Sequence, residues 1–346
     1  MNLKIRWLIL EDGTKFKGLA FGSDNFIQGE LVIHTGMIGY VECLTDPSYQ
    51  NQVLCLTYPM IGNYGVDESF FQSEKIQVAS LIINNLSDYF DKNASSLDKC
   101  LKKYDIAAIS DIDIRALSHH IKINGFMKAI LSNSPQALIT HIKPSVFLND
   151  KKIEIISTKK NLYRVLLINC GCKQAIINSF ISRQVELLIV NHTFDYHNKE
   201  IENYDAIIIS NGPGNPKDYK QVIKNIKKSI DLKTPIFGIC LGHQILALAL
   251  GAKTYKMSYG HRSHNQPILL VGSKKCFNSS QNHSYVVDRD SLPIGCNIWF
   301  KNLNDNSVEG IKSIDQNYYG VQFHPEGASG PSDLSFLFDD FILSLE

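Results

Sequence analysis

The second half of the chain alternates between short apolar runs and longer amphipathic stretches. The apolar runs are continuous, which is typical of strands buried on both faces of a sheet. They occupy residues 165–169, 185–190, 206–210 and 235–239. Helices are expected over 173–183, 219–230 and 241–250, and the last of these stops at Gly251, where a helix commonly ends on glycine. This alternation predicts an α/β fold with an open, mostly parallel sheet covered by helices.

The first half of the chain has a different pattern. Its short apolar runs are separated by Gly, Pro, Asn and Asp, which predicts a β-rich α+β domain with a helix N-capped by Asp111 or Asp113. Near residue 150, lysines flank a short apolar island, as in an exposed linker. We therefore expect one domain over 1–150, a linker over 151–162 and a second domain over 163–346.

Charge and cysteine content exclude several classes of protein. The net charge of +1 gives no sign of a nucleic-acid partner. The apolar run near residue 8 is interrupted by Glu11 and Asp12, too early for a signal peptide or a membrane span. The eight cysteines lack the spacing of a disulfide framework. A reduced, cytoplasmic protein with no membrane and no nucleic-acid partner is expected.

Cys240 lies between Gly238 and Gly242, directly after an apolar run and at the start of a helix. This is the pattern of a nucleophile elbow with cysteine in place of serine. Such a turn leaves no room for a Cβ atom at either glycine. The helix N-terminus favours a thiolate, and the N–H of Leu241 is placed to donate to an oxyanion. The alternative is that Cys240 is simply a small buried residue.

The stretch GVQFHPEG offers a base for this thiol. His324 and Glu326 share a face if the segment is extended, and Pro325 disfavours a helix at His324. Glu326 would then hold the imidazole in the orientation that the thiol requires. Alone, the segment would be interpreted as a surface histidine before a turn. Together with Cys240 it supplies what nucleophilic catalysis needs.

Three further stretches carry polar groups. In SNGPGNP, Gly212 and Gly214 let the backbone approach a ligand and complete an oxyanion hole, or they merely form a tight turn. This turn and Cys240 both follow strands of the predicted sheet, where ligands bind. The polar and aromatic residues of QNHSYVV, at 281–287, have two interpretations: they bind a polar substrate, or they form an ordinary loop. His261 and His264 have metal-like spacing but no nearby acidic or cysteine ligand, so no metal is expected.

Taken together, GICLGHQ, SNGPGNP and HPEG resemble the class I glutamine amidotransferase family. In the first half, EDGTKFKG, TGMIGYVECLTDPSYQNQVLCLTYPMIGNYG and SDIDIRALS are similar to the small subunits of carbamoyl-phosphate synthase. The resemblance covers nearly the whole chain. It implies a three-layer α/β amidotransferase domain preceded by a smaller β-rich domain that docks on a partner.

The resemblance also implies an activity. Cys240 would be the nucleophile of a glutaminase, His324 its base and Glu326 the residue that orients the base. Ammonia would pass to a large subunit that makes carbamoyl phosphate from bicarbonate and two ATP, for arginine and pyrimidine biosynthesis. This chain would need no cofactor, since ATP and its metal ion are expected on the large subunit. The implied glutamine contacts are Ser48, Gly212, Gly214, Leu241, Gln244, Asn282, Ser284 and Tyr285.

Some positions depart from the family pattern. QNHSY stands where QNHGF is usual, which affects Ser284 and Tyr285, and Asn169 and Ala175 replace an aspartate and an asparagine. Three alternatives stay open from the sequence. They are a class I glutaminase of another synthase, a cysteine hydrolase of the α/β-hydrolase type, and a subunit without activity that only stabilises its partner.

Overall fold

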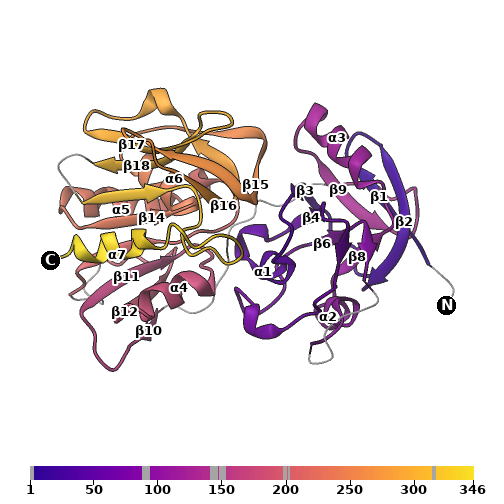
Figure 1. The fold of residues 1–346 in the computed structure, drawn as a ribbon, viewed down its shortest axis with the longest axis horizontal. Coiled ribbons are helices and arrows are strands. Elements are labelled where there is room, and N and C mark those ends of the chain that lie inside the picture. The colour runs from indigo at the N-terminus through magenta and orange to yellow at the C-terminus, as the bar shows by residue number, and fades with distance from the viewer. Residues whose placement is uncertain are drawn as a thin grey trace. The chain divides into compact units, whose positions relative to one another are not determined.

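The structure is a computed structural model that describes residues 4–87, 94–140, 147, 153–197, 201, 203–313 and 317–346. The chain divides into two compact units, Met1–Pro144 and Ser145–Glu346. Each unit has its own sheet system, and Figure 1 shows the first unit in indigo to magenta and the second in magenta to yellow.

The first unit is built on a closed barrel whose strand order is β1-β2-β8-β6-β4-β3-β9. The barrel strands are β1 (Ile5–Leu10), β2 (Lys15–Gly22), β3 (Gly29–His34), β4 (Gln52–Leu56), β6 (Ser80–Ile82), β8 (Ala107–Ser110) and β9 (Lys128–Ser132). Around it lie β5 (Met60–Ile61), β7 (Asn85–Leu86), α1 (Tyr40–Thr45), α2 (Leu97–Lys103), α3 (Ile114–Asn124), and the 3-10 turns η1 (Pro47–Tyr49) and η2 (Glu68–Phe70). The β-rich α+β prediction is confirmed.

Helix α3 shows how local sequence determines where a helix of this unit begins and which face it buries. The Asp113 carboxylate accepts a hydrogen bond from the N–H of Ala116 at 2.8 Å, so Asp113 is the N-cap and not Asp111. Ile114, Leu117 and Ile121 follow helical spacing and are buried. Apolar spacing and a capping carboxylate therefore fix the start and the buried face of this helix.

The second unit contains a ten-stranded sheet in the order β10-β12-β11-β13-β14-β19-β18-β17-β15-β16. Its strands are β10 (Ile153–Ile156), β11 (Tyr163–Asn169), β12 (Val185–Asn191), β13 (Ala206–Ile209), β14 (Ile236–Ile239), β15 (Thr254–Leu270), β16 (Cys276–Val287), β17 (Cys296–Asn302), β18 (Val308–Ser313) and β19 (Tyr318–Val321). The strands from β12 to β19 in this order are parallel, and all the others pair antiparallel. The predicted α/β class is confirmed, but the sheet as a whole is mixed, because short connections such as β15–β16 allow only antiparallel pairing.

Helices cover both faces of this sheet and give the three predicted layers (Figure 1). They are α4 (Gln174–Ile181), α5 (Lys220–Asp231), α6 (Leu241–Ala249) and α7 (Phe336–Leu343), with 3-10 turns η3 (Pro216–Asp218) and η4 (Arg289–Ser291). Phe180 of α4 and Phe338 of α7 belong to the core cluster on one face. Ile226 of α5 and Ile245 of α6 belong to the cluster on the other face.

The predicted linker, 151–162, contains a strand. Residues Ile153–Ile156 form strand β10, which pairs antiparallel with β12 at the edge of the sheet. Ile153 and Ile155 remain largely exposed there, at 41% and 57%. Edge strands commonly carry charged and exposed residues, so this one resembled a linker in the sequence. Residues 148–152, where the expected boundary falls, lie outside the described residues.

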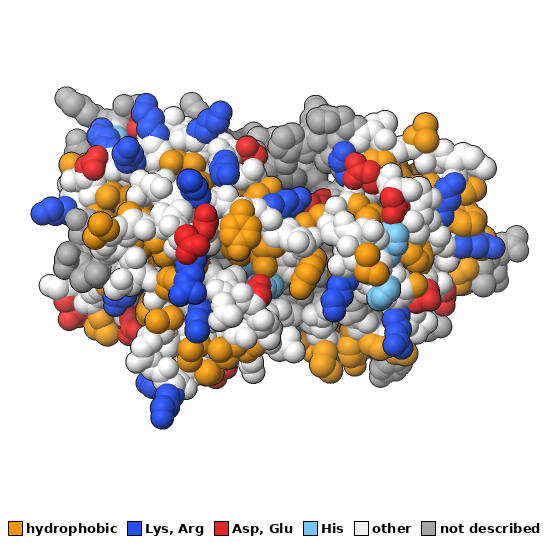
Figure 2. Space-filling view, turned by 90° about the horizontal axis from the view of Figure 1, so that it is seen from above, with side chains coloured by type: hydrophobic (Ala, Val, Ile, Leu, Met, Phe, Trp, Pro, Cys, Tyr) orange, Lys and Arg blue, Asp and Glu red, His pale blue; other side chains and the backbone are white. Residues whose placement is uncertain are grey.

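Most of the cysteines are buried, and the surface carries charges of both signs (Figure 2). All eight cysteines are free, and six of them are buried. In Figure 2, basic side chains are interspersed with acidic ones on the visible face, in keeping with a net charge of +1. Among the helices that the structure describes, each is too short or too polar to span a bilayer.

Candidate active site

Cys240 lies at the junction of β14 and α6 with a φ of 54° and a ψ of −104°. A positive φ is strained for a residue other than glycine, and such strain often marks a functional position. A Cβ atom at Gly238 would lie 2.5 Å from the carbonyl oxygen of Gly242, and one at Gly242 would lie 2.0 Å from that of Ile209. Both positions therefore require glycine, as the elbow pattern predicts.

The sulfur of Cys240 is enclosed by polar groups. It lies 3.7 Å from the carbonyl oxygen of Asn282 and 3.7 Å from Nε2 of Gln322. Cys240 is only 2% exposed. Leu241 begins helix α6, so its N–H belongs to the first turn, whose amides have no acceptor within the helix. The elbow thus presents an amide donor beside a thiol that is shielded from water.

His324, Glu326 and Lys173 form a buried charged chain beside the elbow. Nδ1 of His324 lies 2.6 Å from Oε1 of Glu326, and Nζ of Lys173 lies 2.8 Å from the same oxygen. The three side chains are 2%, 0% and 4% exposed. Within the described residues, Nε2 of His324 is buried and makes no hydrogen bond. Glu326 therefore binds one imidazole nitrogen, and the other nitrogen is available for proton transfer.

Electrostatics keep this chain charged. Burial raises the pKa of Glu326, but Lys173 and His324 outweigh it and lower that pKa to about 2. Burial lowers the pKa of His324, but Glu326 and, to a smaller degree, Cys240 raise it to about 10, against the opposing charge of Lys173. Glu326 and His324 are thus a carboxylate and an imidazolium at neutral pH.

The topology of the sheet explains why these groups meet. Strands β11, β13, β14 and β19 are adjacent and parallel, so their carboxyl ends lie at one edge. Lys173 follows β11, Cys240 follows β14 and His324 follows β19. The N–H of His324 also donates to the carbonyl of Ser280 on β16 at 2.9 Å, which ties the histidine segment to the antiparallel part of the sheet.

The glycine turn after β13 packs against the elbow. A Cβ atom at Gly212 would lie 1.9 Å from the carbonyl oxygen of Cys170 and 3.0 Å from Cδ2 of Leu241. Gly214 has a φ of 86°, which favours glycine. The side chain of Asn211 accepts a hydrogen bond from the N–H of Lys173 at 3.1 Å. This turn therefore bridges the elbow and the lysine.

Most of the implied glutamine contacts surround the elbow. Nε2 of Gln244 donates to the carbonyl of Tyr285 at 2.7 Å and to Oε1 of Gln322 at 2.9 Å. Asn282 reaches the sulfur through its carbonyl. The usual family motif has glycine where this chain has Ser284. The hydroxyl of Ser284 accepts a hydrogen bond from Arg262, so this additional side chain has a partner.

Ser48 belongs to the first unit. It is buried in η1, and its N–H donates to the Asp46 carboxylate at 2.9 Å. Its part in glutamine binding stays a prediction.

The departure at position 169 is accommodated in the same region. Oδ1 of Asn169 accepts hydrogen bonds from the N–H groups of Gly171 and Cys172 at 3.0 and 2.9 Å. An asparagine supplies these bonds as well as an aspartate would. Ala175 is half-buried near the start of α4.

Two residues of the site were missed in the sequence analysis. Lys173 pairs with Glu326, and Gln322 links Gln244 to the sulfur. Lys173 had a usable signal, because it follows a predicted parallel strand and so lies at the same sheet edge as Cys240. Gln322 had none, since its neighbours come from other strands.

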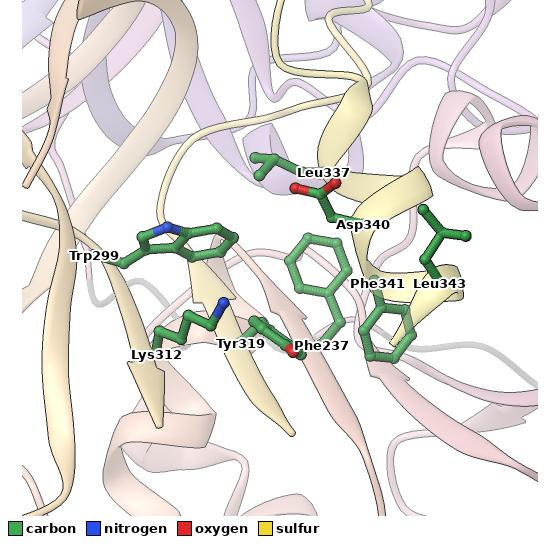
Figure 3. A pocket seen from close by; sticks show the side chains of 8 residues that line it. All are labelled: Phe237, Trp299, Lys312, Tyr319, Leu337, Asp340, Phe341 and Leu343. Carbon is green, nitrogen blue, oxygen red and sulfur yellow. The ribbon is translucent and has the colours of Figure 1, made fainter. Parts of the chain in front are cut away.

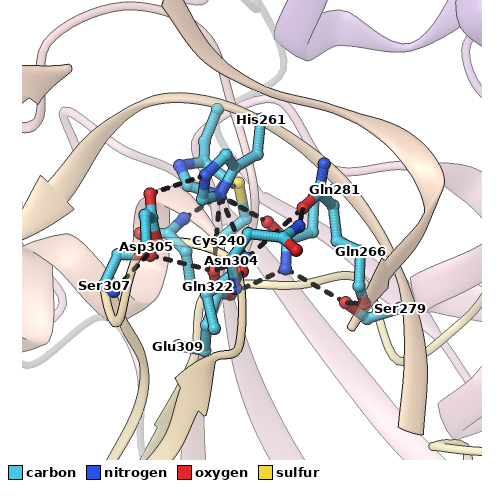
Figure 4. A network of polar contacts seen from close by, with 12 residues as sticks. Cys240, His261, Gln266, Ser279, Gln281, Asn304, Asp305, Ser307, Glu309 and Gln322 are labelled. Carbon is cyan, nitrogen blue, oxygen red and sulfur yellow. Dashed lines mark hydrogen bonds and ion pairs between the residues drawn. The ribbon is translucent and has the colours of Figure 1, made fainter. Parts of the chain in front are cut away.

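A second buried network lies close to Cys240 (Figure 4). Nδ1 of His261 lies 3.0 Å from Oε1 of Gln281, and Nε2 lies 3.0 Å from Oδ2 of Asp305. Glu309 approaches Nδ1 at 3.4 Å. Burial lowers the pKa of His261, but Asp305 and Glu309 raise it to about 9. The acidic partners that the sequence analysis did not find near His261 thus come from β18 and the turn before it.

These residues are also a candidate cation group. His261, His283 and Glu309 place possible ligand atoms within 4.8 Å of one another. A cation would have to displace the hydrogen bonds of His261, and the expectation of no metal stays a prediction. His264 lies elsewhere, with its two nitrogens 3.2 Å from the Ser280 hydroxyl and 3.0 Å from the Ser329 hydroxyl.

Comparison with known proteins gives two family matches. Residues 8–131 match the family described as carbamoyl-phosphate synthase small chain, CPSase domain, and residues 166–344 match glutamine amidotransferase class-I. The chain is 42% identical to the carbamoyl phosphate synthase small chain of Methanocaldococcus jannaschii, over 97% of both chains. It is 40% identical to that of Clostridium acetobutylicum, over 97% of this chain and 98% of the relative. It is 41% identical to the multifunctional protein CAD of Squalus acanthias, over 97% of this chain but 16% of that protein.

Proposed function

The chain belongs to the family of carbamoyl-phosphate synthase small chains, and from this premise we propose that it hydrolyses L-glutamine at Cys240 and delivers the ammonia to a large subunit. The observation that carries the proposal is the strained elbow beside a histidine with one held and one available nitrogen. An α/β-hydrolase would not explain the small-chain match over the first unit. A purely structural subunit would have no use for the strained Cys240 elbow and the His324–Glu326 pair.

The first step is attack by the Cys240 thiolate on the side-chain amide carbon of glutamine. A carbon–sulfur bond forms, and the carbonyl electron pair moves to oxygen. The N–H of Leu241 and the amides of the turn at Gly212 and Gly214 stabilise this oxyanion. Loss of one such donor typically costs about 2.7–4 kcal/mol in the transition state.

Protonated His324 then transfers a proton to the amide nitrogen, and ammonia leaves as the carbon–nitrogen bond breaks. The product is a glutamyl thioester on Cys240. His324, now neutral, takes a proton from water, the resulting hydroxide attacks the thioester, and glutamate and the thiolate are released. Glu326 fixes the ring through Nδ1, so Nε2 is the nitrogen that exchanges protons.

Substrate binding is assigned to residues around the elbow. The proposed contacts are Ser48, Gly212, Gly214, Leu241, Gln244, Asn282, Ser284 and Tyr285. The hydrolysis needs no cofactor, and ATP with its metal ion belongs to the chemistry of the large subunit. We further propose a cytoplasmic heterodimer that serves arginine and pyrimidine biosynthesis.

Release of ammonia into water would waste glutamine, because most of it becomes ammonium, which is not a nucleophile. We therefore expect the large subunit to raise the glutaminase rate, with the first unit as the docking surface.

The test measures glutamate release by the pure chain, by the chain with the large subunit, and by the complex with ATP and bicarbonate. A covalent adduct of Cys240 with an electrophilic glutamine analogue, found by mass spectrometry, checks the nucleophile. A rate that rises only in the complete mixture supports the coupling. Hydrolysis of simple esters but not of glutamine would favour the α/β-hydrolase alternative. Failure to bind the large subunit would favour a glutaminase of another synthase.

A further inference from the structure

A cavity of about 230 Å³ lies between helix α7 and the neighbouring strands of the second unit, and it contains none of the residues assigned to glutamine hydrolysis. Its walls are aromatic, with Phe237, Trp299, Tyr319 and Phe341 contributing rings. Lys312 of β18 and Asp340 of α7 add opposite charges. Aromatic walls with a few placed polar groups are typical of small-molecule sites.

The two charged side chains are separate from each other. Figure 3 shows the Lys312 amine and the Asp340 carboxylate on different sides of the cavity, both directed toward it. The Lys312 nitrogen lies 4.9 Å from the ring centroid of Tyr319 and 5.4 Å from that of Trp299. Within the described residues neither side chain forms an ion pair. A cation and an anion therefore border one partly aromatic space without forming an ion pair with each other.

The size of the space limits the ligand. One water molecule takes about 30 Å³ in the liquid, so the cavity matches roughly eight waters. That is close to the size of a molecule with about nine heavy atoms. A nucleotide is too large, and its phosphates would be repelled by Asp340. A simple carboxylic acid would use only Lys312, and a simple amine would use only Asp340.

We propose that this cavity binds a free α-amino acid with an apolar side chain, such as leucine. The carboxylate of the ligand pairs with Lys312, its ammonium group pairs with Asp340, and its side chain packs against the rings of Trp299, Tyr319 and Phe341. Glutamine is a poorer match, because Phe237, Leu337 and Phe341 offer no partner for its side-chain amide. The site is therefore distinct from the one at Cys240.

Calorimetric titration of the full chain with L-leucine tests the proposal. Two analogues serve as matched ligands: 4-methylpentanoate lacks the ammonium group, and 3-methylbutan-1-amine lacks the carboxylate. Each should bind about tenfold more weakly than leucine or worse, since each loses one charge-assisted hydrogen bond. Cys240→Ser should bind leucine as the parent does, because that change does not touch the cavity.

Lys312→Met and Asp340→Asn should each weaken leucine binding about tenfold. Lys227→Met and Asp231→Asn, on the exposed face of α5, are the matched controls and should change nothing. All four positions are exposed, so the variants are expected to fold, and thermal unfolding checks this. No binding to the parent at about 10 mM leucine, or binding that survives both cavity variants, would overturn the proposal.

Discussion

His324 and His261 are both buried beside carboxylates, and in both cases those carboxylates raise the pKa of the imidazole. They differ at the second ring nitrogen. Both nitrogens of His261 contact protein groups, Gln281 and Asp305. His324 uses only Nδ1, and its Nε2 has no hydrogen-bond partner in the described chain.

This difference separates a structural histidine from a proposed catalytic one. An unsatisfied buried nitrogen costs about 1–3 kcal/mol, so a fold keeps one only where something else compensates. At His324 the unsatisfied atom belongs to a ring beside Cys240, which contributes to the raised pKa of that ring. Burial and a carboxylate therefore do not identify a base. At His324 a carboxylate holds one nitrogen and the other is vacant, whereas among the described residues both nitrogens of the buried His243 lack a partner and no carboxylate holds its ring.

The largest expected effect comes from removing the nucleophile itself. Cys240→Ser should lower glutamine hydrolysis by on the order of 10⁴-fold or more, because a serine hydroxyl is not ionised at neutral pH. Synthesis from free ammonia by the complex should be retained, since the ATP chemistry lies on the large subunit. Glutamate release within tenfold of the parent rate would rule out Cys240 as the nucleophile.

The next effect compares the two histidines directly. His324→Asn should reduce hydrolysis about 10²–10⁴-fold through loss of general acid–base catalysis. His261→Asn should reduce it less than about tenfold, since both nitrogens of His261 serve hydrogen bonds. Steady-state glutaminase assays on both variants make the comparison. Equal losses would mean that the vacant nitrogen does not distinguish the two sites.

His261→Asn should instead destabilise the fold. It leaves Glu309, which is fully buried, without its cationic neighbour, and breaking a buried charge pair typically costs about 3–5 kcal/mol. Urea unfolding monitored by fluorescence measures this loss. His264→Asn is the comparison variant on the same strand, with hydroxyl partners in place of carboxylates, and it should cost less. A His261 variant as stable as the parent would contradict this prediction.

The smallest effect is a pH dependence of stability, of a few kcal/mol at most. The pKa of Glu326 is lowered from 4.5 to about 2, so its contribution is complete above pH 4.5 and is lost as the pH falls toward 2. The pKa of His324 is raised from 6.5 to about 10, so its contribution is complete below pH 6.5 and is lost as the pH rises toward 10. The stability difference between the parent and Glu326→Gln should therefore be greatest between pH 4.5 and 6.5. If unfolding curves measured across this pH range showed no such maximum, the predicted charge pair between Glu326 and His324 would be contradicted.

The elbow and the histidine segment were predictable because their geometry is local. Two glycines around Cys240 and an extended spacing between His324 and Glu326 determine which groups face each other. The parallel strands around them are continuous apolar runs, which remain buried on both faces whichever residues pair between strands. Local pattern therefore sufficed to predict the α/β class, the two residues proposed to react, and the glutamate that orients one of them.

The contacts that were not predicted depend on the order in which strands lie side by side in the sheet. Asp305 and Glu309 reach His261 only because β17 and β18 lie between β19 and β15 in the sheet. Strand β15 also contains register shifts between Lys256 and His261 and between Ser263 and Gln266, which change the facing of its side chains. Nothing in the sequence near His261 specifies these bulges or that order. Strand β10 escaped for the related reason that an edge strand needs no buried face.

The closed barrel of the first unit restricts how a second protein can attach to it. Among the described residues, each of its seven strands has a hydrogen-bonded neighbour on both sides, although β3 and β9 pair only over Gly29–Glu30 and Lys128–Ala129. A closed barrel leaves little room for a partner to extend the sheet by adding a strand, which is a common mode of peptide recognition. Recognition on the barrel itself therefore relies mainly on side chains, helices and turns, and this makes it more sensitive to single surface substitutions than backbone pairing would be.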